Sequence, residues 1–101
     1  MPRSLRVTLP PPEPLVTSLA ALGRLVRAAR LASGLRIDDA AALCGVSVDL
    51  LSRLENGRSG VSTDRLLKVL DALGLAMLVP DKAKLPKVLN ALADREEPAG
   101  G

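Results

Sequence analysis

Glycines at positions 34, 45, 57 and 74 divide the middle of this 101-residue chain into short segments rich in leucine, valine and alanine. Within the segments, apolar residues recur three or four positions apart, as in Leu22, Leu25, Val26 and Ala29. Side chains at this spacing share one face of a helix, and glycine commonly ends helices. The spacing predicts an all-α fold of four helices, with a short second helix over residues 40–44 and a third over 48–56.

The composition supports helices and excludes several kinds of functional site. Hydrophobic residues make up 48% of the chain, but Phe, Tyr and Trp are absent, so the core must consist of Leu, Val and Ala. RNA-binding modules and single-strand-binding modules stack bases on aromatic rings. The absence of aromatic residues therefore argues against both kinds of module. The chain has no His and one cysteine, Cys44, which we expect to be a buried structural thiol. We therefore expect no metal, no cofactor and no enzymatic activity.

Residues 1–17 are interpreted as a proline-rich arm, with prolines at positions 10, 11, 12 and 14. Leu5, Val7 and Leu9 alternate with polar residues there, which indicates either a short strand or a flexible lead. The first 36 residues hold six arginines and one glutamate, a charge suited to phosphate or to an acidic protein. No apolar run approaches the roughly 18 residues of a membrane span, so we expect a soluble, cytoplasmic protein.

Two features follow Gly74. The first is an unbroken apolar run, Leu75, Ala76, Met77, Leu78 and Val79, ended by Pro80. It fits either a strand, which would pair with its own copy in a dimer, or a short buried helix. The second is an apolar stripe in the tail over residues 81–101, formed by Leu85, Val88, Leu89 and Leu92 at the spacing of a short amphipathic helix. That stripe suits either docking on another protein or packing on its own domain, and residues 94–101 are expected to be disordered.

The segment from Ile37 to Arg58 carries the functional signal. Its two short helices are joined by a tight turn at residues 45–47, and Ala41 is small where the helices approach. This is the helix-turn-helix arrangement, whose second helix enters the DNA major groove. In the second helix the leucines share one side; the other side carries Val48, Asp49, Ser52 and Arg53. Arginine is the side chain that most often binds guanine O6 and N7.

One stretch resembles the helix-turn-helix domain of the phage-repressor (XRE-like) family: GVSVDLLSRLENGRSGVSTDRLLKVLDALGL. Within it, SRLENG followed by GVSTDRLLKVLDALGL is similar to the HipB-type antitoxins, and the resemblance covers roughly residues 22–80. It implies a lambda-repressor-like domain over residues 18–80 and a homodimer on a palindromic operator. It also implies that residues 75–79, with Leu75, Met77, Leu78 and Val79, form a dimerisation strand, which favours the strand over the helix.

The resemblance further implies residue roles. Base contacts fall on Val48, Asp49 and Arg53, with Ser52 beside them. DNA-backbone contacts fall on Arg36, Ile37, Ser47, Asn56 and Arg58. Arg30 and Glu55 match an internal salt bridge. The chain departs from the family at Arg36-Ile37, where many relatives have Thr-Gln, and at Val48, which offers only an apolar contact.

Three hypotheses about function follow. The leading one is a repressor that serves as the antitoxin of a type II toxin–antitoxin pair, autoregulating its operon and holding a HipA-like kinase toxin through the stripe of Leu85, Val88, Leu89 and Leu92. The second is a stand-alone regulator. The third is a protein-interaction module that has lost DNA binding, suggested by Ile37, Val48 and Asp49.

Overall fold

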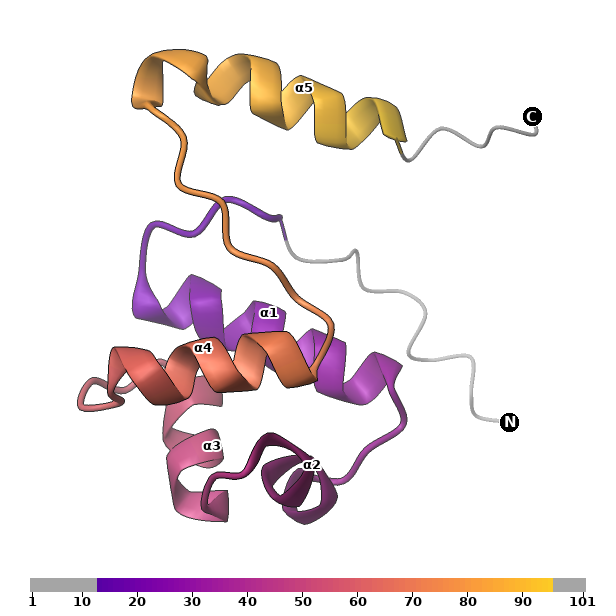
Figure 1. Ribbon diagram of the computed structural model, residues 1–101, viewed down its shortest axis with the longest axis vertical. Coiled ribbons are helices and arrows are strands. Elements are labelled where there is room, and N and C mark those ends of the chain that lie inside the picture. The colour runs from indigo at the N-terminus through magenta and orange to yellow at the C-terminus, as the bar shows by residue number, and fades with distance from the viewer. Residues whose placement is uncertain (1–12, 96–101) are drawn as a thin grey trace.

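The computed structural model describes residues 13–95. They form α1 (Leu19–Ala32), α2 (Ile37–Cys44), α3 (Val48–Glu55), α4 (Thr63–Ala72), the single 3-10 turn η2 (Lys82–Lys84) and α5 (Leu85–Arg95), arranged as in Figure 1. The all-α prediction is confirmed. The expectation of disorder from residue 94 onward is wrong at residues 94 and 95, which belong to α5. The strand or flexible lead near Leu5 and the last residues of the tail, 96–101, lie outside the described part of the chain.

Three serines fix where helices begin. Their hydroxyl oxygens accept backbone hydrogen bonds: Ser18 from Ala21 at 3.0 Å, Ser47 from Leu50 at 3.0 Å and Ser62 from Arg65 at 3.2 Å. Each bond satisfies an N–H that has no partner inside its helix, typically worth about 1 kcal/mol. The caps therefore set the first residues of α1, α3 and α4. Among these, α3 is the helix that bears the candidate base contacts.

The second helix begins earlier than the sequence suggested. The predicted range 40–44 is wrong at its start, because α2 begins at Ile37 after an extended Arg36. Asp38 and Asp39 lie inside its first turn, where their charges interact favourably with the positive end of the helix dipole. The third helix differs from its prediction at its C-terminal end. It stops at Glu55, one residue before the predicted 56, and Asn56 is its C-cap.

The three largest fully buried side chains of the core come from three different helices: Val26 of α1, Leu51 of α3 and Val69 of α4. The second helix contributes small residues, Ala40, Ala41 and Cys44. Leu22, Leu54, Leu70 and Leu73 complete the cluster. Burial raises the pKa of the Cys44 thiol, which favours its protonated, unreactive form. Small side chains in α2 allow close packing against α3, so the core holds this pair of helices as a unit.

After α4 the chain becomes extended. The Leu75 amide donates to the Leu70 carbonyl at 2.8 Å, and residues 75–80 are then neither helix nor strand. The alternative of a short buried helix is therefore wrong. The predicted strand has no partner within residues 13–95 and stays a prediction about a second copy. The segment leads to α5, which lies at the opposite end of the molecule from α2 and α3 (Figure 1). None of the described helices is both long enough and apolar enough to span a membrane.

Candidate functional site

The turn between α2 and α3 occupies three residues. Gly45 adopts a left-handed conformation with φ 73° and ψ 34°, which glycine tolerates without steric cost. The Val46 amide donates to the Ala41 carbonyl at 3.0 Å, closing the end of α2, and Ser47 immediately caps α3. Across the turn, a Cβ added at Gly45 would lie 3.4 Å from Lys68 Nζ of α4. The two helices are thus joined rigidly, with a cation beside the carbonyl end of α2.

The third helix has one buried and one exposed face. Leu51 and Leu54 are 0% and 3% exposed and point into the core. On the opposite face Val48, Asp49 and Arg53 are exposed, and Ser52 is partly exposed. The four residues assigned to base contacts therefore share one solvent-facing surface.

Arg53 is anchored on this face by the loop that follows α3. Its Nη2 atom donates a hydrogen bond to the Ser59 carbonyl at 3.2 Å. Within residues 13–95 it takes part in no salt bridge, so its charge is not neutralised by a carboxylate. Gly60, the next residue, lies against the guanidinium.

The residues assigned to DNA-backbone contacts lie at the start of α2, at both ends of α3 and in the loop after α3, and they differ in what they offer. Arg58 is exposed. Arg36 is also exposed and lies 3.5 Å from the Asp38 carboxylate. Ser47 uses its oxygen as a helix cap, which leaves its O–H free to donate. Ile37 packs its side chain against the core, so only its backbone at the start of α2 is offered to a phosphate.

Asn56, the fifth of these residues, is already bonded within the protein. Its Nδ2 atom donates to the Ser52 carbonyl at 2.8 Å and lies 3.5 Å from the Ser52 hydroxyl. These bonds connect a candidate backbone contact with a candidate base contact. A bond to an external acceptor would use the second Nδ2 hydrogen in place of the long contact with the Ser52 hydroxyl.

An ion pair fixes the end of α3 to α1. Arg30 donates from Nε to Glu55 Oε2 at 2.6 Å and from Nη2 to Oε1 at 2.9 Å, and from Nη1 to the Leu35 carbonyl at 3.1 Å. The two side chains are 11% and 6% exposed. Hydrogen bonding to Glu55 raises the pKa of Arg30 further above its ordinary value. The pair therefore joins α1, α3 and the loop before α2 through charges held out of water.

Two glycines allow α1 to approach the same end of α3. A Cβ at Gly23 would lie 2.5 Å from the Glu55 carbonyl oxygen and 2.6 Å from that of Leu54. A Cβ at Gly57 would lie 2.8 Å from Ala20 Cα. Both obstacles are backbone atoms, which cannot move aside independently.

Substituting Gly23 with Ala should reduce the free energy of unfolding by about 1–3 kcal/mol, because overpacking forces the two helices apart. Helix propensity alone would predict the opposite sign, because alanine stabilises a helix interior by up to about 1 kcal/mol relative to glycine. Chemical denaturation followed by circular dichroism measures the sign. A stabilised variant would show that the close approach of α1 to α3 is wrong.

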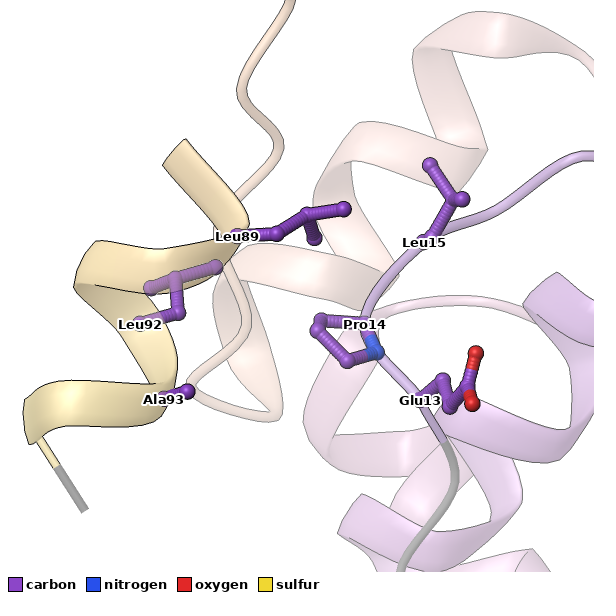
Figure 2. Close-up of a pocket in the computed structure, with 6 residues that line it drawn as sticks. All are labelled: Glu13, Pro14, Leu15, Leu89, Leu92 and Ala93. Carbon is purple, nitrogen blue, oxygen red and sulfur yellow. The ribbon is translucent and has the colours of Figure 1, made fainter. Parts of the chain in front are cut away.

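A second surface lies away from α3, between the arm and α5. Glu13, Pro14 and Leu15 face Leu89, Leu92 and Ala93 across a pocket of about 400 Å³ (Figure 2). A neighbouring apolar groove of about 570 Å³ is lined by residues from the arm, α1, α4, residues 75–80 and α5, including Leu85 and Val88. Of the predicted dimerisation residues, Leu75 is partly buried, whereas Met77, Leu78 and Val79 are exposed. The stripe of α5 therefore faces apolar surface that its own chain leaves incompletely covered.

Sequence reasoning missed three contributors to this arrangement. Gly23 was not singled out, because a glycine inside a helical pattern gives no sign of what it approaches. Lys68 and the Ser59-Gly60 loop were missed because their contacts, with Gly45 and Arg53, come from the folded geometry. A glycine in a loop can indicate a positive φ, and Gly60 has a φ of +94°.

Among the described residues, no group of three His, Cys, Asp or Glu side chains is placed to hold a metal ion. The exposed face of α3 offers a guanidinium, a carboxylate, a hydroxyl and an apolar side chain within one helix. Such a mixture suits the edges of base pairs, which present donors, acceptors and methyl groups.

Comparison with known proteins agrees with this geometry. A family model described as a helix-turn-helix domain matches residues 21–79. No curated protein sequence matches significantly. Two solved structures, a HipB–O4 20mer complex and a HipA–HipB–O2–O3 complex, superpose with a TM-score of 0.60 at 22% identity, covering 67% of this chain and 96% of theirs.

A third structure is the clp gene regulator ClgR from C. glutamicum, with a TM-score of 0.53, 27% identity, and coverage of 84% of this chain and 99% of its own. The resemblance to the phage-repressor-like family is thus confirmed, and the fold is that of the HipB structures. The chain belongs to the helix-turn-helix domain family.

Proposed function

We propose that this protein is a sequence-specific transcriptional repressor that inserts α3 into the major groove of double-stranded DNA. One observation carries the proposal: the apolar face of α3 is buried while the face bearing Arg53 is open to solvent and charged. A recognition helix must be held by its domain on one side and free on the other. Arg53 is the proposed contact with guanine, and Val48, Asp49 and Ser52 are its neighbours on the base edges. The proposal includes that the protein is not an enzyme and that it acts in the cytoplasm.

The flanking groups supply the proposed backbone contacts. Arg36 and Arg58 bring charge. The backbone of Ile37 and the hydroxyl of Ser47 bring hydrogen-bond donors at the starts of α2 and α3, and Asn56 brings a donor at the end of α3. Contacts of this kind fix position and orientation on the duplex and carry no sequence information. Asp38 offsets part of the charge of Arg36, so Arg58 should contribute the larger share of phosphate attraction.

We propose a homodimer on a palindromic operator, with residues 75–79 paired across the two copies. No backbone hydrogen bond within the described chain involves residues 76–79, so these groups remain available to a second strand. Val79 is 88% exposed and Leu78 is 65% exposed, which is unfavourable for apolar side chains unless they are covered. Pairing of two copies would supply hydrogen-bond partners for the backbone N–H and C=O groups of this segment. It would also cover the exposed apolar side chains.

The partner proposed beyond DNA is a HipA-like kinase toxin, which would make the protein an antitoxin that autoregulates its operon. Similarity to HipB in a HipA–HipB complex supports this. The stripe of α5, lying away from α3, leaves the DNA face free while another protein binds (Figure 1). A stand-alone regulator is the second candidate, favoured by the match to ClgR over most of both chains. A kinase-like gene adjoining this one, whose product co-purifies with it, would separate the two.

The roles of the two arginines are separable by substitution. Arg53→Ala should weaken binding at the preferred site by about 1–3 kcal/mol and relax preference at one base pair of each half-site. Arg58→Ala should weaken preferred and random duplexes alike and make the salt dependence of binding shallower. Selection from a randomised duplex pool followed by titration at several salt concentrations measures both. An Arg53→Ala variant with unchanged base preference would contradict the base contact. A wild-type protein that binds no DNA would favour the third hypothesis, a protein-interaction module that has lost DNA binding.

A further inference from the structure

The loop after α3 shapes the surroundings of Arg53 at a residue with no side chain. Gly60 has φ +94°, and a Cβ built on it would lie 2.8 Å from Arg53 Nη2 and 3.9 Å from Cζ. The first distance is shorter than real Cβ contacts allow, so any side chain at position 60 must displace the guanidinium. The preceding residue, Ser59, accepts the hydrogen bond from the same nitrogen at 3.2 Å.

We propose that Gly60 is a positioning residue for sequence recognition: together with the Ser59 carbonyl, it holds the Arg53 guanidinium in the orientation that contacts a guanine. This inference rests on the proposed function. The loop acts on the orientation of Arg53 through a carbonyl on one side and through the absence of a Cβ on the other. Neither feature requires contact between the loop and a base.

The donor inventory of arginine is compatible with this role. A guanidinium carries five N–H donors in a fixed plane. The Ser59 carbonyl takes one donor on Nη2, which leaves Nε, Nη1 and the second Nη2 hydrogen. A guanine needs two of these for its O6 and N7. Holding one edge of the plane therefore leaves enough donors, and a side chain ordered before binding loses less conformational freedom when DNA arrives.

The main test compares Gly60→Ala with Gly34→Ala. Both glycines have a positive φ, but a Cβ at Gly34 would meet nothing within 4 Å, so that variant carries the backbone strain without a clash. We expect Gly60→Ala to lower the preference for guanine at the Arg53 position by about tenfold, within the range known for a bidentate contact. Its affinity for random duplexes should match that of Gly34→Ala. Equal base preference in the two variants would overturn the proposal.

The background of Arg53→Ala separates this inference from the proposed function. If Gly60 acts through Arg53, adding Gly60→Ala to Arg53→Ala should change base preference no further. An additional loss in the double variant would overturn the positioning role while leaving the base contact intact. An Arg53→Ala variant that keeps full preference would instead overturn the base contact itself.

A measurement on the unmodified protein decides the matter even if Gly60→Ala fails to fold. Nitrogen relaxation of the arginine side chains should show Arg53 Nε ordered in the free protein and the exposed Arg58 Nε mobile. Order parameters near 0.85 describe rigid groups and values below about 0.6 describe flexible ones. An Arg53 side chain as mobile as that of Arg58 would contradict the proposal.

Discussion

Glu55→Ala is expected to reduce the free energy of unfolding by about 3–5 kcal/mol, because it leaves the Arg30 guanidinium buried without its partner. The two hydrogen bonds between these side chains are 2.6 and 2.9 Å long, and both groups are largely removed from water. A small domain has a total stability of only about 5–15 kcal/mol. The variant should therefore be partly unfolded near physiological temperature, as urea denaturation will show.

Two controls show whether burial is the cause. Arg36→Ala breaks the exposed pair with Asp38, whose side chains are 81% and 58% exposed, and should change stability by less than about 1 kcal/mol. The double variant Arg30→Met with Glu55→Leu removes both charges and should recover most of the loss. A Glu55→Ala variant as mild as Arg36→Ala would show that the pair does not hold α1 to α3.

Val79→Asp is expected to convert the protein into a monomer and to weaken operator binding by about 10²–10⁴-fold. The size of this loss follows from avidity: two linked half-site contacts bind far more tightly than one. Because Val79 is 88% exposed in the single chain, the substitution should leave the protomer folded. Sedimentation equilibrium measures the mass, and titration with the selected duplex measures the affinity.

Leu31→Asp is the matched control. Leu31 is also exposed, at 54%, but it lies on α1, outside residues 75–79. This variant should remain dimeric and keep its affinity. A Val79→Asp protein that stays dimeric would show that the two copies meet through another surface.

The sequence predicted the helices well because several independent signals agreed. Ser47 before the third helix, Gly45 in the turn, and leucines at positions 51 and 54 all specify the same local structure, and each is observed as a cap, a left-handed turn or a buried side chain. The start of α2 was harder to locate. Ile37 packs on the core rather than ending a loop, and Asp38 and Asp39 enter the helix because the dipole favours acids in the first turn.

The candidate site was predictable in its face and not in its detail. Helical periodicity alone separates Arg53 from Leu51 and Leu54, since their directions are fixed by position along the helix. Periodicity carries no information on what a long side chain meets outside its own helix. The Ser59 carbonyl and bare Gly60 beside Arg53, like the approach of Gly23 to the carbonyls of α3, arise only when separate segments are brought together.

The most direct test of the central claim is interference by guanine analogues that lack N7, placed one at a time in the duplex that the protein selects. N7 is an acceptor in the major groove, so its removal deletes one bond to an arginine without altering base pairing. We predict that the wild-type protein loses affinity at one guanine in each half-site and that Arg53→Ala is insensitive at that same position. Equal binding to every analogue-containing duplex would contradict the insertion of α3 and Arg53 into the major groove.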